Sequence, residues 1–185
     1  LSISRALTSA AALGVDRLDA QWMLEKLIGQ PRSWLIAHGD ALLSEDQRLQ
    51  YVHWLGRRAT GEPLAYLFGE KEFHGLQLRV GPQVLIPRPD TETLVVGGLQ
   101  WPFGGLSAIE DPLRVAPGTG SGAIALATKH RCAAVAMTAA DVSGPALELA
   151  RANASALGIS VELVQGDWWA AVPGRRFDLC LANPS

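Results

Sequence analysis

Three glycines at alternate positions, Gly118, Gly120 and Gly122, follow a short apolar run at 113–116 and precede an Ala-rich segment. This order predicts a strand, a tight turn and the start of a helix. Glycine suits such a turn because it adopts positive φ angles freely and leaves room for a ligand against the backbone. The spacing differs from the Gly-x-Gly-x-x-Gly of dinucleotide-binding proteins. We therefore expect a nucleoside without phosphates to bind here, with an ordinary glycine-rich connection as the alternative.

Further polar and aromatic residues follow the next three predicted strands. Asp141 follows the second strand, and its carboxylate can accept hydrogen bonds from both hydroxyls of a ribose. Asp167 and Trp168 follow the third, where they suit the amino group and the face of an adenine. Asn183-Pro184 follows the fourth. Each also has a structural explanation, as a helix cap, a turn residue or a core aromatic.

Helical and strand patterns alternate along the second half of the chain, which predicts βαβ units and a parallel sheet. We expect helices near 91–99, from the glycine turn to about 130, and over 143–157, and strands at 113–116, 134–138, 161–165 and 177–182. The carboxyl ends of such strands share one edge of the sheet, where ligands bind. The residues that follow the four strands are therefore predicted to converge on one site.

The first 62 residues are predicted to form a small helical domain. Asp16 is placed to cap a helix that ends near Gly29. Ser44 and Gln47 have the spacing of a capping box, in which each side chain satisfies a backbone N–H group of the other residue. The helix that begins there would bury one face, made of Leu49, Val52, either Leu55 or Gly56, and Ala59.

The section from 63 to 89 changes to the alternation typical of strands. Apolar residues at 76, 78 and 80 alternate with polar ones, and Gly81-Pro82 separates them from a second apolar run at 84–86. This pattern predicts a β-hairpin with its turn at Gly81-Pro82. We expect the hairpin to link the helical domain at 1–62 to an α/β domain at 90–185.

Composition limits the class of protein. The chain has 185 residues, 48% of them hydrophobic and 18% charged, and a formal net charge of -2. These values favour a folded protein and give no electrostatic reason for a polyanionic partner. Cys132 and Cys180 lie in or beside apolar segments, which predicts buried thiols in a reducing compartment. With no membrane span or signal-peptide pattern in the sequence, we expect a cytoplasmic protein.

Several motifs together resemble the S-adenosylmethionine-dependent methyltransferases: the glycine turn, Asp141, Gly166-Asp167-Trp168 and Asn183-Pro184. The leader at 85–92, Leu-Ile-Pro-Arg-Pro-Asp-Thr-Glu, is similar to one family among them, the protein-glutamine methyltransferases of the HemK/PrmC type, which modify peptide chain release factors. The Gly-Glu-Pro-Leu-Ala-Tyr-Leu segment at 61–67 and the helical N-terminal part resemble that family's small substrate-binding domain. The resemblance covers nearly the whole chain.

The resemblance implies a fold and a cofactor. The fold would be a helical bundle, a hairpin linker and the first half of a Rossmann-like methyltransferase sheet over 90–185. S-adenosylmethionine would be bound by Gly118, Thr119, Gly120, Gly122, Asp141, Asp167 and Trp168. No metal is expected, since the sequence shows no cluster of metal ligands.

The reaction implied is methyl transfer to the side-chain amide nitrogen of the glutamine in a release factor's Gly-Gly-Gln loop. In the family's Asn-Pro-Pro-Tyr motif, the Asn side chain and the backbone carbonyl after it accept hydrogen bonds from the substrate amide. Asn183 and Pro184 would have those roles here, as catalytic and substrate-binding residues. Arg88 is a further candidate for substrate binding. Arg88 and Glu92 could also form a local ion pair with each other.

The chain departs from the family's pattern at two places. The family has Asp-Leu before the first glycine, where this chain has Ala116-Pro117, which weakens the expected hold on the methionine end of the cofactor. The Asn-Pro-Pro-Tyr motif stops after Pro184, because Ser185 is the last residue. We therefore expect the chain to be a fragment of an active enzyme that does not catalyse alone.

Two other functions stay open. Amino-group methyltransferases acting on adenine or cytosine use a similar motif, but they need a basic channel for a flipped base, and no basic stripe is evident here. A remnant domain that binds a nucleoside or a protein without catalysis is the second alternative. If the protein is a glutamine methyltransferase, we expect a release factor as its partner, no direct binding of nucleic acid and a monomer.

Overall fold

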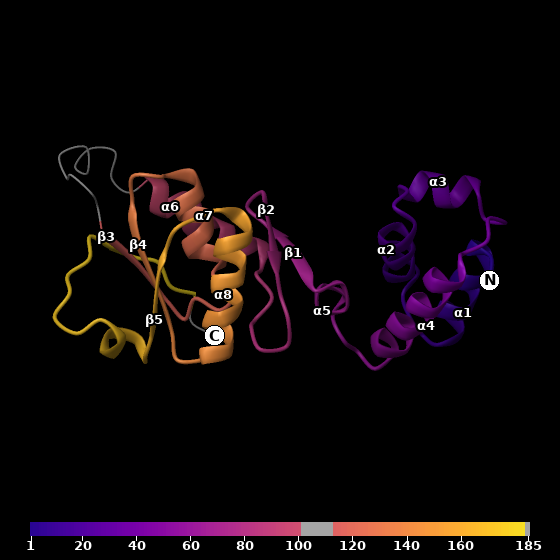
Figure 1. Cartoon of the computed structure of the whole chain (residues 1–185). Coiled ribbons are helices and arrows are strands. Elements are labelled where there is room, and N and C mark those ends of the chain that lie inside the picture. The colour runs from indigo at the N-terminus through magenta and orange to yellow at the C-terminus, as the bar shows by residue number, and fades with distance from the viewer. Residues whose placement is uncertain (101–112, 184–185) are drawn as a thin grey trace. The chain divides into compact units, whose positions relative to one another are not determined.

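The computed structural model describes residues 1–100 and 113–183, without the side chains of residues 99 and 100. The chain divides into two compact units, Leu1–Phe68 and Gly69–Ser185 (Figure 1). The β-hairpin belongs to the second unit. The three-part division with boundaries after residues 62 and 89 stays a prediction.

The first unit consists of helices, two of which were predicted from the sequence. The helices are α1 (Ile3–Ala12), α2 (Arg17–Ile28), α3 (Arg32–Ala37), α4 (Glu45–Ala59) and α5 (Leu64–Phe68). The carboxylate of Asp16 accepts the Leu18 N–H at 2.7 Å, and α2 ends at Gly29 in the left-handed conformation. Ser44 and Gln47 form the predicted capping box at the start of α4. Local side-chain chemistry therefore sets the ends of α2 and the start of α4.

The buried face of α4 differs from the predicted one. Leu55 is buried as predicted, but Leu49 and Val52 are 53% and 52% exposed. Tyr51 and Trp54 are buried in their place. Aromatic side chains bury more apolar area than Leu or Val, which favours the orientation that turns them into the core.

Tyr51 gives this unit a predictable dependence on pH. Its side chain is fully buried, and its hydroxyl donates to the Ala6 carbonyl at 3.0 Å. Burial raises the pKa of Tyr51 from 10.0 to about 12. Because the unfolded chain loses this proton first, stability is fully present below pH 10 and falls between pH 10 and 12. Over this range the free energy of unfolding should fall by at most about 1.4 kcal/mol per pH unit because of Tyr51.

We expect Tyr51→Phe to lower the free energy of unfolding by about 1 kcal/mol at pH 8, because it removes one buried hydrogen bond. The free energy of unfolding of the variant should also decrease less steeply above pH 10, because the variant has no Tyr51 hydroxyl to ionise. Urea unfolding from pH 8 to 11, followed by circular dichroism, measures both effects. Parallel pH profiles for Tyr51→Phe and the unchanged protein would contradict the assignment.

The second unit contains a hairpin and a parallel sheet. The hairpin pairs β1 (Glu70–Phe73) with β2 (Leu76–Arg79). The sheet has the order β5-β4-β3-β6, with β3 (Leu113–Pro117), β4 (Ala136–Asp141), β5 (Glu162–Gln165) and β6 (Leu179–Cys180), all parallel. Its helices are α6 (Glu92–Gln100), α7 (Ala123–Arg131) and α8 (Gly144–Leu157), with 3-10 turns η1 (Pro89–Thr91) and η3 (Trp168–Ala171). The predicted Rossmann-like architecture is confirmed.

The predicted register of the hairpin is wrong. Its turn is His74-Gly75, whose φ angles of 50° and 80° match a two-residue turn of type I′. Gly81 begins a separate turn, in which its carbonyl accepts the Val84 N–H at 3.1 Å, and residues 84–86 form no strand. Phe73 pairs with Leu76 across this turn, and both side chains are buried.

Helices α6, α7 and α8 share one core with alternate strand residues. Its buried members include Val95, Ala116, Leu126, Ala139, Ala154 and Leu181. Thr138 lies between Met137 and Ala139 in β4 and therefore points to the opposite face of the sheet. There Arg175 donates to the Thr138 hydroxyl at 3.1 Å and to the Glu162 carboxylate at 3.0 Å. The Thr138 hydroxyl and Arg175 together lower the pKa of Glu162.

Strand β6 is shorter than the predicted strand at 177–182. Leu179 and Cys180 are in register with β3, and the flanking Asp178 and Leu181 donate their N–H groups to the Leu113 and Val115 carbonyls at 2.8 and 2.9 Å. Cys180 is exposed, whereas the sequence predicted a buried thiol, and Cys132 is half-buried. The difference follows from the position of β6, which is an edge strand among the described residues.

Candidate active site

The glycine turn joins β3 to α7. Gly118, Gly120 and Gly122 have φ angles of 63°, 54° and 84°, which confirms the predicted need for glycine. A Cβ on Gly122 would lie 3.1 Å from Leu126 and 3.2 Å from Ala150, so this glycine also permits close packing. A Cβ on Gly118 would meet nothing within 4 Å. The first part of the turn therefore faces open space, where a ligand can approach the backbone.

Asp141 lies at the carboxyl end of β4 and supports the glycine turn. One carboxylate oxygen accepts the Gly120 N–H at 2.8 Å, and the other accepts the Ser143 N–H at 2.9 Å. The Thr119 N–H donates to the Ala140 carbonyl at 3.0 Å, which ties the turn to the same strand. Each carboxylate oxygen can accept a second hydrogen bond, so Asp141 keeps acceptor capacity for a ligand hydroxyl.

Asn153 on α8 connects the glycine turn to the hairpin and was not predicted from the sequence. It is 1% exposed. Its Oδ1 accepts the Arg79 N–H at 2.8 Å, and its Nδ2 donates to the carbonyls of Arg79 at 3.0 Å and Ser121 at 2.9 Å. The available signal was a polar residue within the apolar stripe that Leu147 and Ala150 form at helical spacing.

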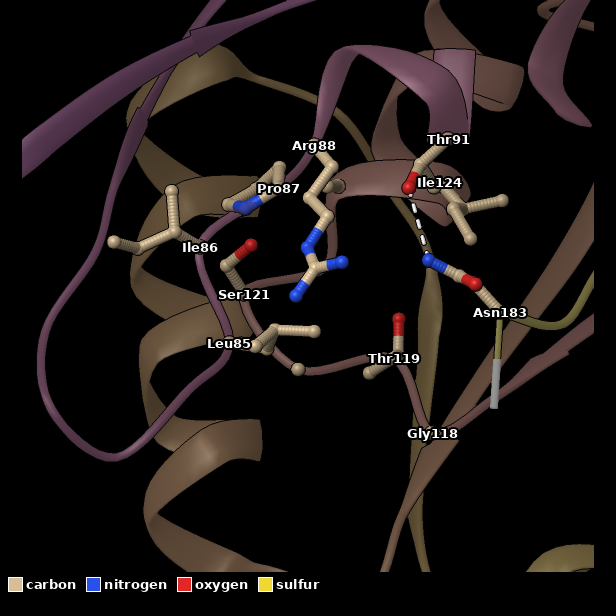
Figure 2. A pocket seen from close by; sticks show the side chains of 12 residues that line it. Leu85, Ile86, Pro87, Arg88, Thr91, Gly118, Thr119, Ser121, Ile124 and Asn183 are labelled. Atoms are coloured by element: carbon tan, nitrogen blue, oxygen red, sulfur yellow. Dashed lines mark hydrogen bonds between the residues drawn. The ribbon is translucent and has the colours of Figure 1, made fainter. Parts of the chain in front are cut away.

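A cleft brings the leader segment, the glycine turn and the end of β6 together (Figure 2). The residues that line it are Leu85, Ile86, Pro87, Arg88, Thr91, Gly118, Thr119, Gly120, Ser121, Ala123, Ile124 and Asn183. Asn183 donates through Nδ2 to the Thr91 hydroxyl at 2.9 Å. The Thr119 hydroxyl is buried and has no hydrogen-bond partner within the described chain. A buried unpaired hydroxyl on a cleft wall is a group that a ligand can satisfy.

Arg88 extends its guanidinium group into this cleft (Figure 2). The side chain is exposed, and it forms no ion pair with any residue that the structure describes. Glu92 instead accepts the His74 backbone N–H through Oε1 at 3.2 Å. An ion pair between Arg88 and Glu92 is therefore not formed, and the guanidinium is available to a ligand.

Several predicted site residues do not line the cleft. Gly122 and Asp141 support the turn from behind, as described above. Asp167 is exposed, and Trp168 is 45% exposed with a φ of 43°. Their proposed contact with an adenine stays a prediction. Pro184 lies outside the described residues.

Ala116-Pro117 forms the end of β3, directly before the glycine turn. Ala116 is 1% exposed and belongs to the apolar core under α7, and its neighbour in β4 is Ala139. An Asp in place of Ala116, as in the methyltransferases that the sequence resembles, would thus stand at a buried position, where a carboxylate needs a partner. The structure shows no replacement for that carboxylate among the cleft residues.

Two general features of the described residues bear on function. None of their helices is both long enough and apolar enough to cross a lipid bilayer. Residues 1–100 and 113–183 also contain no group of three or more His, Cys, Asp or Glu side chains arranged to hold a metal ion.

Comparison with known protein families gives two matches. Residues 2–69 match the PrmC N-terminal domain, and residues 114–185 match the methyltransferase small domain. Release factor glutamine methyltransferase of Bordetella pertussis is 41% identical over 172 residues, which are 92% of this chain and 62% of that protein. The Escherichia coli protein of the same name is 38% identical over 184 residues, 98% of this chain and 64% of that protein. The chain thus spans about three fifths of the length of these relatives.

Among solved structures, a ribosomal protein L11 methylase from Lactobacillus delbrueckii superposes with a TM-score of 0.45 at 29% identity, over 58% of this chain and 52% of that one. The likeness to known proteins consists of the two domain matches, in their order along the chain, and the identity to the two named relatives. The chain is therefore similar over most of its length to proteins named release factor glutamine methyltransferase, and it carries matches to a PrmC N-terminal domain and a methyltransferase small domain.

Proposed function

We propose that the protein transfers a methyl group from S-adenosylmethionine to the side-chain amide nitrogen of the glutamine in the Gly-Gly-Gln loop of a peptide chain release factor. The observation that carries this proposal is the position of Asn183 in the same cleft as the glycine turn. Relatives that are 41% and 38% identical are named for this activity. The presence of Asn183 and the glycine turn in one cleft supports a site that holds a methyl donor beside an amide.

The cleft residues fit a nucleoside cofactor. Gly118 presents open backbone, and the Thr119 hydroxyl lacks a partner among the described residues. Asp141 would accept ribose hydroxyls with its remaining lone pairs, and Asp167 and Trp168 would contact the adenine. A Cβ built on Gly118 would meet no neighbouring heavy atom within 4 Å, so the space beside this backbone is open. These features support S-adenosylmethionine as the cofactor.

The chemical difficulty is the low nucleophilicity of an amide nitrogen, because its lone pair is delocalised into the carbonyl group. The cofactor, when bound, supplies a methyl group that is activated by a positive sulfur. Asn183 would accept an N–H of the substrate amide through Oδ1, and the Pro184 carbonyl would accept the other. These two hydrogen bonds would hold the amide in one orientation, so positioning would contribute most of the rate.

Methyl transfer to a purified release factor tests the proposal. The full-length gene product that contains this chain is incubated with S-adenosylmethionine labelled in the methyl group, and the release factor is digested and analysed by mass spectrometry. We expect label on the Gly-Gly-Gln glutamine and none on a release factor in which that glutamine is replaced by alanine. Label on DNA but not on the release factor would favour the nucleic-acid alternative. Binding of the cofactor without any transfer would favour the remnant domain.

Asn183→Ala should separate catalysis from cofactor binding. We expect kcat to fall about 100-fold, because the substrate amide loses the group that orients it. The dissociation constant for S-adenosylmethionine, measured by calorimetry, should stay within about two-fold, since the glycine turn is unchanged. A kcat close to that of the unchanged protein would show that Asn183 does not orient the substrate.

The remaining features of the proposal concern where the protein acts. A protein that modifies release factors would act in the cytoplasm, in translation termination. The formal net charge of -2 supports a protein substrate over direct binding of nucleic acid. We expect the protein to act as a monomer, which light scattering at assay concentration checks.

A further inference from the structure

Thr91 is the hydrogen-bond partner of Asn183, although the two residues lie 92 positions apart in the sequence. The Thr91 side chain is 7% exposed, and its Oγ1 accepts the Asn183 Nδ2–H at 2.9 Å. Both residues line the cleft (Figure 2). The hydrogen bond therefore joins the leader segment to the residue proposed to bind the substrate amide.

The backbone around Thr91 is well fixed. Pro89, Asp90 and Thr91 form η1, and the Thr91 N–H donates to the Arg88 carbonyl at 3.0 Å. Helix α6 begins at the next residue, and Val95, one turn further along, is fully buried in the core of the second unit. Thr91 thus presents its hydroxyl from a rigid support.

Asn183 lacks such support of its own. The last hydrogen bond of its segment to the sheet is the one from the Leu181 N–H to the Val115 carbonyl at 2.9 Å. Asn183 lies two residues beyond it and is exposed. Among the residues that the structure describes, Thr91 is its only side-chain partner. Without Thr91, the Asn183 amide could rotate about both of its side-chain torsions.

We propose that Thr91 is a positioning residue for methyl transfer, a role that rests on the function proposed above. Its hydroxyl holds the Asn183 NH₂ group, which leaves Oδ1 free to accept the N–H of the substrate amide. Thr91 does not contact the substrate or the cofactor in this role. It acts by keeping the Asn183 amide in the one orientation that aligns the substrate nitrogen.

Three variants of the full-length gene product test this role. Thr91→Val keeps the shape of the side chain but removes the hydroxyl, and Thr91→Ser keeps the hydroxyl but removes a methyl group. Thr93→Val is the matched control, because the Thr93 hydroxyl lies in the same segment but donates to the Asp90 carbonyl at 2.6 Å and forms no hydrogen bond with Asn183.

We expect Thr91→Val to lower kcat about 10-fold, with the KM for the release factor and the dissociation constant for S-adenosylmethionine within about two-fold. Thr91→Ser should retain at least about half of the original kcat, and Thr93→Val should match the unchanged protein. A merely structural role would instead make Thr91→Ser, which leaves a small cavity, as harmful as Thr91→Val.

The outcomes separate this role from the proposed function. Equal kcat values for Thr91→Val and the unchanged protein would overturn the role of Thr91 alone. Equal losses in Thr91→Val and Thr91→Ser would overturn it too, because the hydroxyl would then not matter. Absence of release-factor methylation by the unchanged protein would overturn the proposed function, and the role of Thr91 with it.

Discussion

Replacement of Asn153 by leucine is expected to lower the free energy of unfolding of the second unit by at least about 3 kcal/mol. Leucine has the same branched shape as asparagine, with the same number of side-chain heavy atoms, but makes none of its three hydrogen bonds. The Arg79 N–H would lose its acceptor, and the carbonyls of Arg79 and Ser121 would lose a donor. Asn153 is 1% exposed, so water does not replace these bonds without a structural change.

Urea unfolding measures this loss, and Ser155→Leu serves as the control. Ser155 lies on the exposed side of the same helix, where a change to leucine should alter stability by no more than about 0.5 kcal/mol. A loss below about 1 kcal/mol for Asn153→Leu would show that the buried backbone groups find other partners. The variant should also bind S-adenosylmethionine more weakly, since the Ser121 carbonyl of the glycine turn is no longer held.

The sequence contained most of the information on the parallel sheet, because that information is local. Helix α8 was predicted almost to the residue: Ser143 caps its start through a 3.3 Å hydrogen bond to the Ala146 N–H, and Gly158 ends it with a φ of 65°. The glycine turn was predictable for the same reason, since alternate glycines suit a run of positive φ angles. Signals of this kind act within a few residues of the backbone they control.

The hairpin shows where local signals conflict. Both Gly75 and Gly81 are possible turn residues, and the apolar alternation alone does not choose between them. The structure places the two-residue turn at His74-Gly75, where Phe73 and Leu76 pair and are both buried in the core. Register is decided by which side chains reach a buried face, and that face is built by helices from much later in the chain.

The candidate site was predictable in part. Its glycine turn and Asn183 follow strands of one parallel sheet, so their convergence followed from topology. The side chains that hold them did not follow, because Thr91 meets Asn183 across 92 positions and Asn153 meets Arg79 across 74. Contacts of that separation depend on how helices pack on the sheet, which no periodicity in the sequence encodes.

Replacement of Arg114 is expected to stabilise the protein, in contrast to the replacement of Asn153. It lies in the central strand β3 and is 4% exposed. Its Nε and Nη1 are buried without a hydrogen-bond partner in the described part of the chain. Its register neighbours are Met137 in β4 and Leu179 in β6, so apolar side chains flank it on both sides. A cation in such a place loses its hydration and gains little in return.

We expect Arg114→Leu to raise the free energy of unfolding by about 3 kcal/mol, because a buried cation whose Nε and Nη1 have no partner among the described residues costs several kcal/mol and leucine suits the neighbouring apolar side chains. Urea unfolding against Arg151→Leu gives a matched comparison, since Arg151 is exposed on α8 and its replacement should change stability by no more than about 0.5 kcal/mol. A decrease in stability for Arg114→Leu would show that the guanidinium is stabilised by its surroundings. An increase in the free energy of unfolding would show that the Arg114 charge destabilises the fold. The sheet that carries the glycine turn would then be stabilised by the surrounding apolar core.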